Sequence, residues 1–287
     1  MFLVVGANGQ LGNELKLILG GNAEYVDREQ LDITDAAAVK AFVKPEKYAA
    51  VINCAAYTAV DKAESDAVLA EKINVDGPRH LAETGVPLLQ VSTDYVFDGT
   101  GHRPYTESDE ANPQSVYGVT KLAGERVALE KASGCFVVRT AWLYSTFGNN
   151  FVKTMRRLGA ERDSLNVVFD QIGSPTYARD LAEAIVAALP KLKPGVKEIY
   201  HFSDEGVCSW YDFAVAIMAL SGLKCAVKPI ESKDYPTPAK RPFYSVLNKG
   251  KIKKDLGIEI RHWSESLKDC VEKLNNCLLY TSPSPRD

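Results

Sequence analysis

The chain has 287 residues, of which 46% are hydrophobic and 25% are charged, and its formal net charge is -3. These values predict a soluble globular protein with one large domain or a domain with an elaborated second lobe, and the lack of a long basic run argues against a nucleic-acid partner. The start shows no signal-peptide pattern, and no run approaches the roughly 20 apolar residues of a membrane span. The six cysteines form no C-x-x-C, so we expect a cytoplasmic protein without a membrane partner, a zinc site or a dense disulfide framework.

The first element is the clearest. Phe2–Val5 is a short apolar run typical of a buried parallel strand, and it leads through three glycines with G-x-x-G-x-x-G spacing into a helical pattern. Strand, glycine turn and helix in this order suit a dinucleotide, because the turn lets the backbone approach a pyrophosphate and the helix N-terminus offers free N–H groups. The predicted cofactor-binding residues of this turn are Gly6, Asn8, Gly9, Gln10, Leu11 and Gly12.

The second predicted strand ends at Asp27, about 20 residues after the glycine turn, where a dinucleotide site places a carboxylate on a ribose hydroxyl. Arg28 follows and is suited to a 2′-phosphate, so the choice between NADH and NADPH stays open. Asp32 and Ile33 are candidates for the adenine edge. An approach to a helix cap plus one core residue explains this pair equally well.

The third predicted strand, Ala50–Asn53, is followed by small residues that would let a cofactor ribose approach the backbone. Ala55, Ala56 and Tyr57 are therefore candidate cofactor contacts. Two helices are expected next, over residues 60–72 and 74–84.

A strand over residues 88–92 delivers Thr93 to the carboxyl end of the sheet, where ligands bind in doubly wound folds. Tyr117 and Lys121 lie four apart on the next predicted helix, so their side chains share a face. A cation near a phenol favours its ionised form, which suits proton transfer near neutral pH. The sequence therefore predicts Tyr117 and Lys121 as catalytic residues, with a hydroxyl of Ser92 or Thr93 holding a carbonyl.

The alternation of short strands and helices predicts an α/β fold, a Rossmann-type doubly wound parallel sheet with a smaller C-terminal substrate lobe. We expect a dinucleotide-binding core over residues 1–145 and a lobe over 146–277, interleaved into one compact unit. Polar loops at 170–176 and 233–248 are expected to build the lobe. Two Ser-Pro steps predict a disordered tail over 278–287, and its sequence leaves open whether the tail is native or foreign to the natural gene.

Several motifs together resemble the extended short-chain dehydrogenase/reductase superfamily and, within it, the dTDP-4-dehydrorhamnose reductase family. They cover nearly residues 1–276 and comprise the glycine turn, Ala55–Glu64, Ser92–Phe97, Tyr117–Lys121, Arg139–Trp142, Asp170–Thr176, Ser209–Phe213 and Arg241–Pro242. The resemblance implies reduction of the C4 ketone of dTDP-4-dehydro-β-L-rhamnose to dTDP-L-rhamnose, for surface polysaccharide. NADPH or NADH would be the cofactor and the nucleotide sugar the substrate partner.

The same resemblance implies roles for single residues. Tyr117 would give a proton to the carbonyl oxygen, Lys121 would tune Tyr117 and bind the nicotinamide ribose, and Thr93 would contact the sugar. Asp94 and Trp142 would shape the sugar pocket. Because some family members are described as magnesium-dependent dimers, a homodimer and a Mg²⁺ contact at Glu14 are further expectations; an exposed glutamate on a solvated helix face is the favoured alternative for Glu14.

Two other functions fit the same motifs. One is a reductase or epimerase of another nucleotide-linked deoxysugar, which would use the same tyrosine and lysine. The other is a non-catalytic homologue similar to the regulatory subunit of methionine adenosyltransferase. Turnover of cofactor with the dehydrorhamnose substrate would separate them.

Overall fold

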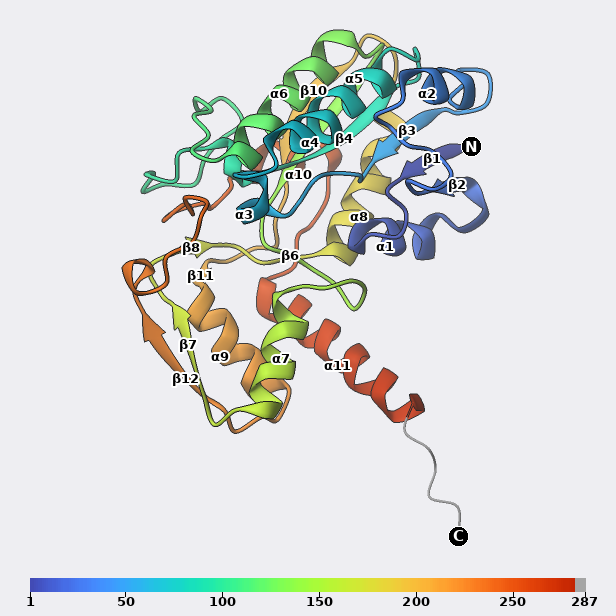
Figure 1. The fold of residues 1–287 in the computed structure, drawn as a ribbon. Coiled ribbons are helices and arrows are strands. Elements are labelled where there is room, and N and C mark those ends of the chain that lie inside the picture. Colours follow the sequence, from blue (N-terminus) through green and yellow to red (C-terminus); the bar gives the residue numbers. More distant parts are fainter. Residues whose placement is uncertain (282–287) are drawn as a thin grey trace.

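The computed structural model describes the backbone of residues 1–281 and the side chains of residues 1–276. Its central sheet has six parallel strands in the order β10-β5-β4-β3-β1-β2 (Figure 1). The predicted Rossmann-type fold is therefore confirmed, and the order reverses between β1 and β3, the position at which such sheets bind ligands. The strands are β1 (Phe2–Val5), β2 (Ala23–Val26), β3 (Ala50–Asn53), β4 (Leu88–Thr93), β5 (Cys135–Thr140) and β10 (Lys197–His201).

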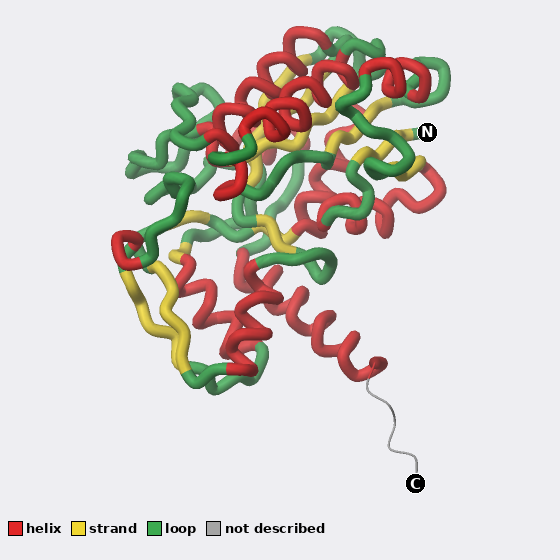
Figure 2. The backbone as a smooth tube through the Cα atoms, viewed as in Figure 1, coloured by secondary structure: helices red, strands yellow, loops and turns green. Residues whose placement is uncertain are grey.

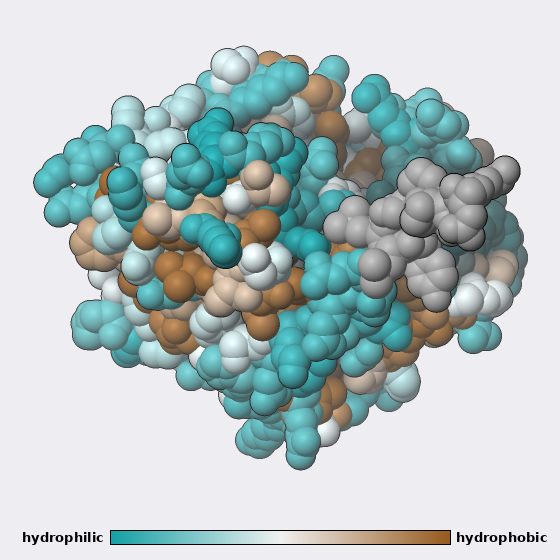
Figure 3. Space-filling model, turned by 90° about the horizontal axis from the view of Figure 1, so that it is seen from below, coloured by the Kyte–Doolittle hydropathy of each residue, from teal (hydrophilic) through white to brown (hydrophobic). Residues whose placement is uncertain are grey.

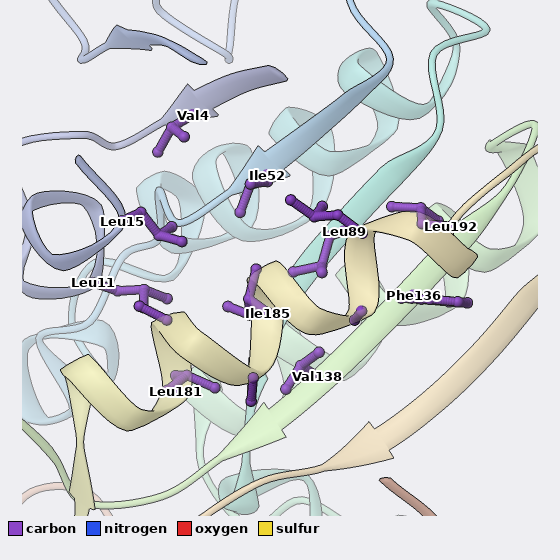
Figure 4. Packing of buried hydrophobic residues seen from close by; sticks show 14 of the residues in the cluster. Val4, Leu11, Leu15, Ile52, Leu89, Phe136, Val138, Leu181, Ile185 and Leu192 are labelled. Carbon is purple, nitrogen blue, oxygen red and sulfur yellow. The ribbon is translucent and has the colours of Figure 1, made fainter. Parts of the chain in front are cut away.

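Helices cover both faces of this sheet (Figure 1). One face packs on α2 (Ala36–Phe42), α5 (Gly77–Ala82) and α6 (Val116–Lys131), and the other on α1 (Gln10–Leu19), α8 (Ala178–Ala188) and α10 (Gly250–Leu256). Figure 4 shows Leu15 and Ile185 pointing at the strand side chains Ile52 and Leu89. Because both faces are buried, the strands read as continuous apolar runs.

The C-terminal lobe, in which helices lie beside a pair of strands (Figure 2), has its own core with the fully buried Tyr144, Tyr177 and Phe213. It consists of α7 (Phe151–Glu161), α9 (Trp210–Leu220), α11 (Trp263–Thr281) and the parallel pair β7 (Ser164–Val168) and β12 (Ala226–Ile230). Two short pairs join it to the sheet layer: β6 (Leu143–Tyr144) with β9 (Thr176–Tyr177), and β8 (Ile172–Gly173) with β11 (Cys208–Ser209). Because α8, β10 and α10 return to the Rossmann layer, the lobe is interleaved with the core.

The predicted single helix over 60–72 is wrong. The chain forms α3 (Val60–Ala63), α4 (Ala67–Glu71) and a π-helical turn, η2 (Lys72–Asp76), that leads directly into α5. The break falls at a turn in which the Asp66 N–H donates to the Ala63 carbonyl, while the Asp66 carboxylate accepts from the Tyr57 hydroxyl. Shorter 3-10 turns are η1 (Gly20–Asn22), η3 (Asp94–Val96), η4 (Leu189–Lys191) and η5 (Ser232–Asp234).

Helix α11 runs past the predicted start of the tail at Leu278 and ends at Thr281. The rest of the predicted tail, residues 282–287, lies outside the described residues.

Hydrophilic side chains cover most of one face of the molecule, between separate apolar patches (Figure 3). Over the described residues, every helix is too short or too polar to cross a membrane.

Candidate active site

A cleft of about 840 Å³ opens at the carboxyl ends of β1, β3, β4 and β5. Its walls come from the glycine turn, the segments after β2 and β3, the end of β4, helix α6 and the segment after β5. The topology therefore brings most of the predicted site residues together. Those that line the cleft are Gly6, Asn8, Gly9, Gln10, Leu11, Gly12, Asp27, Arg28, Ile33, Ala55, Ala56, Thr93, Asp94, Tyr117, Lys121 and Trp142.

The glycine turn leaves no room for side chains at two of its positions. Gly6 has a φ of 75°, and a Cβ there would lie 2.6 Å from the Ala55 nitrogen; a Cβ on Gly12 would lie 2.5 Å from the Gly6 oxygen. Gly9 is the N-cap of α1 and no side chain caps this helix. The N–H groups of its first turn are thus free for an anion, which fits the pyrophosphate of a nicotinamide dinucleotide.

Asp27 sits at the end of β2 with both carboxylate oxygens engaged. The backbone N–H of Asn8 donates to Oδ2 at 2.9 Å and that of Arg28 to Oδ1 at 2.8 Å. The Arg28 guanidinium is 77% exposed and lies 3.4 Å from the Asp32 carboxylate. A carboxylate and an exposed cation therefore lie side by side at the adenosine end of the cleft.

Of the predicted adenine pair, only Ile33 lines the cleft; Asp32 does not. The Asp32 carboxylate accepts from the N–H and hydroxyl of Thr34, at 2.9 and 2.7 Å, and so serves a turn before the N-cap of α2, Asp35. Leu31, on the other side of Asp32, lines the cleft with Ile33.

Tyr57 is also not brought into the cleft, unlike Ala55 and Ala56. Its ring is buried in a cluster with Ala63, Ala70 and Tyr117, and its hydroxyl donates to Asp66 at 3.1 Å. Asn74, in the π-helical turn, holds the Tyr57 backbone at both its N–H and its carbonyl. Tyr57 thus supports the wall of the cleft and the ring of Tyr117.

Helix α6 begins where the sequence predicts because the Ser115 hydroxyl caps it, accepting from the Gly118 N–H at 3.2 Å. Tyr117 and Lys121 follow in the first two turns and both line the cleft. Lys121 is 4% exposed, and its Nζ donates to the Val91 carbonyl at 2.7 Å.

The pKa of Tyr117 is set in this structure by burial, followed by its neighbours Thr93, Asp94 and Tyr95. Burial raises the pKa of the Tyr117 hydroxyl above its usual range, and Thr93 opposes the rise only in part. Burial also lowers the pKa of Lys121 to about 8. The site therefore holds a protonated phenol at neutral pH, which is the form that donates a proton.

The two hydroxyls at the end of β4 have different tasks. Ser92 lines the cleft, and its hydroxyl donates to the buried Glu125. Thr93 donates to Asp94 at 3.0 Å and caps the following 3-10 turn by accepting from the Tyr95 N–H. Asp94 is 2% exposed, burial raises its pKa to about 6, and its Oδ2 has no hydrogen-bond partner among the described residues. An unsatisfied buried oxygen at a cleft is well suited to a polar ligand.

Trp142 has a φ of 50°, a left-handed conformation rare for a bulky residue. Its ring stacks on Trp210 at 3.6 Å, and a Cβ on Gly173 would lie 2.6 Å from it. The predicted polar loop at 170–176 thus packs behind the indole. A strained backbone conformation that is held in place by surrounding packing is typical of functional sites.

Sequence reasoning missed Tyr95, Gly148 and Asn149, which line the cleft. The Tyr95 ring meets the Tyr117 ring edge-on at 5.5 Å, and its hydroxyl accepts from Arg241 at 2.9 Å. The loop before α7 reaches the glycine turn through Asn150, whose amide donates to Gln10 at 3.0 Å. Tyr95 could have been found, since it directly follows the predicted Thr93 and Asp94. The contact of Asn150 with Gln10 joins residues 140 positions apart, so no local sequence pattern indicates it.

Glu14 is buried, so the expectation of an exposed glutamate is wrong. It is 2% exposed, accepts from the Ser145 hydroxyl at 2.6 Å, and burial raises its pKa. Arg179 lies 3.9 Å away. Mg²⁺ takes ionised oxygen ligands together with waters, so this enclosed carboxyl with a nearby cation does not fit a magnesium site within one chain.

The parallel sheet, the glycine turn and the Tyr117–Lys121 pair define the extended short-chain dehydrogenase/reductase class. The family described as RmlD substrate binding domain matches residues 1–276, and the chain belongs to this family. It is 44% identical to the dTDP-4-dehydrorhamnose reductase of Streptomyces griseus, over 99% of this chain and 97% of that protein. It is also 39% identical to a probable dTDP-4,6-dihydroxy-2-methyloxan-3-one 4-ketoreductase of Streptomyces antibioticus, over 93% of each.

Two solved structures share the whole fold. A dTDP-4-dehydrorhamnose reductase from Clostridium acetobutylicum has a TM-score of 0.91 and 47% identity, over 96% of this chain and 99% of that one. The enzyme of the same name from Bacillus anthracis, in complex with NADP, has a TM-score of 0.90 and 38% identity, over 95% and 98%.

Proposed function

We propose that the protein is an NADPH-dependent reductase that converts the C4 ketone of dTDP-4-dehydro-β-L-rhamnose to the alcohol of dTDP-L-rhamnose. The observation that carries the proposal is that Thr93, Tyr117 and Lys121 line the same cleft as the glycine turn, where no side chain caps helix α1. Full-length relatives named for this reaction support it.

The glycine turn and the first turn of α1 would hold the cofactor pyrophosphate, with Asp27 on the adenosine ribose and Ile33 beside the adenine. A bound nicotinamide cofactor supplies the hydride that reduces the ketone carbon. Lys121 would bind the nicotinamide ribose through its ammonium.

The protein's own part in the chemistry is to place a proton donor at the ketone oxygen. Tyr117 would donate its hydroxyl proton to that oxygen, which gains negative charge as the carbon is reduced. Its raised pKa keeps the proton available at neutral pH. Thr93 and the unpaired oxygen of Asp94 would hold hydroxyls of the sugar, and Trp142 would form an apolar wall.

NADPH is proposed as the preferred cofactor because the exposed guanidinium of Arg28 lines the adenosine end of the cleft, where it can contact a 2′-phosphate. Asp27 would still accept from a ribose hydroxyl beside that phosphate, because each of its oxygens takes only one backbone N–H. The relative from Bacillus anthracis was solved with NADP.

A second candidate is 4-ketoreduction of another dTDP-linked sugar, which the Streptomyces antibioticus relative favours. Cofactor oxidation should be followed with dTDP-4-dehydrorhamnose and with other dTDP-4-ketosugars. We expect the highest kcat/KM with the dehydrorhamnose substrate. A higher value with another ketosugar would select the second candidate, and no oxidation with any of them would favour a non-catalytic homologue.

A further inference from the structure

Two charged residues near Lys121, Glu125 and Arg139, are buried and have no role in the proposed reaction. Glu125 is 1% exposed and Arg139 is 4% exposed. Glu125 stands four residues after Lys121 on α6, so the two side chains share a face of the helix. Arg139 lies on β5, opposite Ser92 of β4 in the sheet register.

The carboxylate of Glu125 is fixed from two strands. Arg139 donates to it through Nε, 2.9 Å from Oε1, and through Nη2, 2.7 Å from Oε2. The Ser92 hydroxyl donates to Oε1 as well. A bidentate guanidinium contact sets both position and orientation, so the carboxylate cannot turn away from Lys121.

Arg139 is held in turn by His201 of β10. The His201 Nδ1 lies 3.0 Å from the Tyr105 carbonyl, which only accepts, so Nδ1 carries the hydrogen and Nε2 accepts from Arg139 at 3.4 Å. Burial, followed by the Arg139 charge, lowers the pKa of His201 to about 3, so the ring adds no charge at neutral pH.

Among the described residues, two ionisable groups shift the pKa of Lys121, and one of them is a carboxylate. They are Glu125 from α6 and the Cys54 thiol from β3. Burial raises the pKa of Cys54 to about 12, so this thiol is neutral. Glu125, one helical turn from Lys121 and ion-paired with Arg139, is then the negative charge that acts on the Lys121 ammonium.

Packing between helix α6 and the sheet does not require an ion pair. Apolar residues of similar volume in place of a buried ion pair often leave the free energy of unfolding equal or higher. Without the Glu125 charge, Lys121 and Arg139 would be two buried cations with no counter-ion. The charge of Glu125 therefore neutralises Arg139 and also acts on Lys121.

We propose that Glu125, fixed by Arg139 and Ser92, is a positioning residue that acts through Lys121 by keeping its ammonium charged and seated at the Val91 carbonyl. The inference rests on the proposed role of Lys121 in binding the cofactor. It concerns cofactor binding and does not depend on which sugar is reduced.

The test is the dissociation constant of NADPH, measured by its fluorescence across a pH range that brackets 8, without sugar substrate. In the unchanged protein, affinity should fall as the pH rises through about 8, because Lys121 loses its proton there. In Glu125→Gln the fall should begin about one pH unit lower, since an opposite charge within a few ångströms shifts a pKa by about that much or more. Lys121→Met should show no such fall, and adding Glu125→Gln to it should change nothing.

Ser92→Ala is the matched control, because it removes a bond to Glu125 and leaves the charge in place. Its midpoint should match that of the unchanged protein; a shift equal to that of Glu125→Gln would show that the hydrogen bonds that hold Glu125, and not its charge, matter. An unchanged midpoint in Glu125→Gln would overturn the proposal.

If Glu125→Gln does not fold, Glu125→Asp keeps Arg139 paired and draws the carboxylate back by one methylene. A smaller downward shift is then expected, and an unchanged midpoint would overturn the proposal. Loss of sugar reduction with these NADPH profiles intact would refute the proposed function alone.

Discussion

Tyr117 holds its proton at neutral pH because its hydroxyl is buried, while Lys121 donates to a backbone carbonyl. The sequence spacing alone suggested a lysine that lowers the pKa of the phenol. In this structure the two side chains share the cleft, and burial is the largest influence on the pKa of Tyr117. The Tyr117 hydroxyl therefore keeps its proton at neutral pH and can donate it to a substrate.

Tyr117→Phe removes only the hydroxyl and keeps the ring in contact with Tyr57 and Tyr95. We expect kcat to fall roughly 10²- to 10⁴-fold, the usual contribution of a general acid. NADPH affinity and the thermal midpoint should stay close to those of the unchanged protein. Near-normal turnover would place the proton donor elsewhere.

Arg28→Gln tests the cofactor preference at the other end of the cleft. Loss of a charge-assisted contact to a 2′-phosphate should raise the KM for NADPH about tenfold, equivalent to about 1.4 kcal/mol. The KM for NADH should change little, because NADH has no such phosphate. Equal changes for both cofactors would contradict the role given to Arg28.

Most of the residues that line the cleft could be predicted from the sequence, because ligands of a doubly wound sheet bind at the carboxyl ends of its strands and at the glycine turn. Asp32 and Tyr57 were exceptions. Whether Asp32 serves a turn or a ligand depends on Thr34, and the direction of Tyr57 depends on Asn74 and Asp66, partners that spacing does not reveal.

Among the elements, the loop over 233–248 is tied to the Rossmann core by Arg241. Its guanidinium donates to the Tyr95 hydroxyl at 2.9 Å and to Asp61 Oδ2 at 2.5 Å, and the Ala239 N–H donates to Asp61 Oδ1 at 3.2 Å. Tyr95 lines the cleft beside Tyr117. The sequence predicted this loop as part of the substrate lobe, but not its hold on Tyr95.

Arg241→Met should therefore raise the KM for the nucleotide sugar several-fold and leave the NADPH dissociation constant unchanged, because Tyr95 loses its anchor. Combined with Asp61→Asn in a double-mutant cycle, it should give a coupling energy of about 0.5–1 kcal/mol for this half-exposed pair. Purely additive effects would show that the two side chains do not act together.

The elements that the sequence missed lack a periodic signal. Helix α9 is apolar on nearly every side, so no stripe marks it, although its capping box at Ser209 and Asp212 was readable. Strand β12 contains Pro229, which argues against a strand and is tolerated at an edge.

The whole molecule combines a Rossmann layer with a lobe that has a separate core, joined by short strand pairs and by returning elements. The alternating pattern predicted the first layer. The lobe follows from pairings such as β7 with β12 across about 60 residues, which single-sequence patterns do not specify.

Phe213→Ala tests the independence of the lobe core. This fully buried ring contacts Tyr144, Phe151 and Trp263, so its loss should cost about 3–5 kcal/mol of unfolding free energy in urea. Leu220→Ala on the same helix is the control; Leu220 is 37% exposed and its loss should cost far less. Similar costs for both would contradict the described core.

The most direct measurement uses NADPH carrying deuterium at the transferred position and locates the label in the sugar product by NMR. The account predicts deuterium at C4 of dTDP-L-rhamnose, in step with cofactor oxidation. Deuterium at another carbon, or oxidation of the cofactor without a labelled sugar, would contradict it.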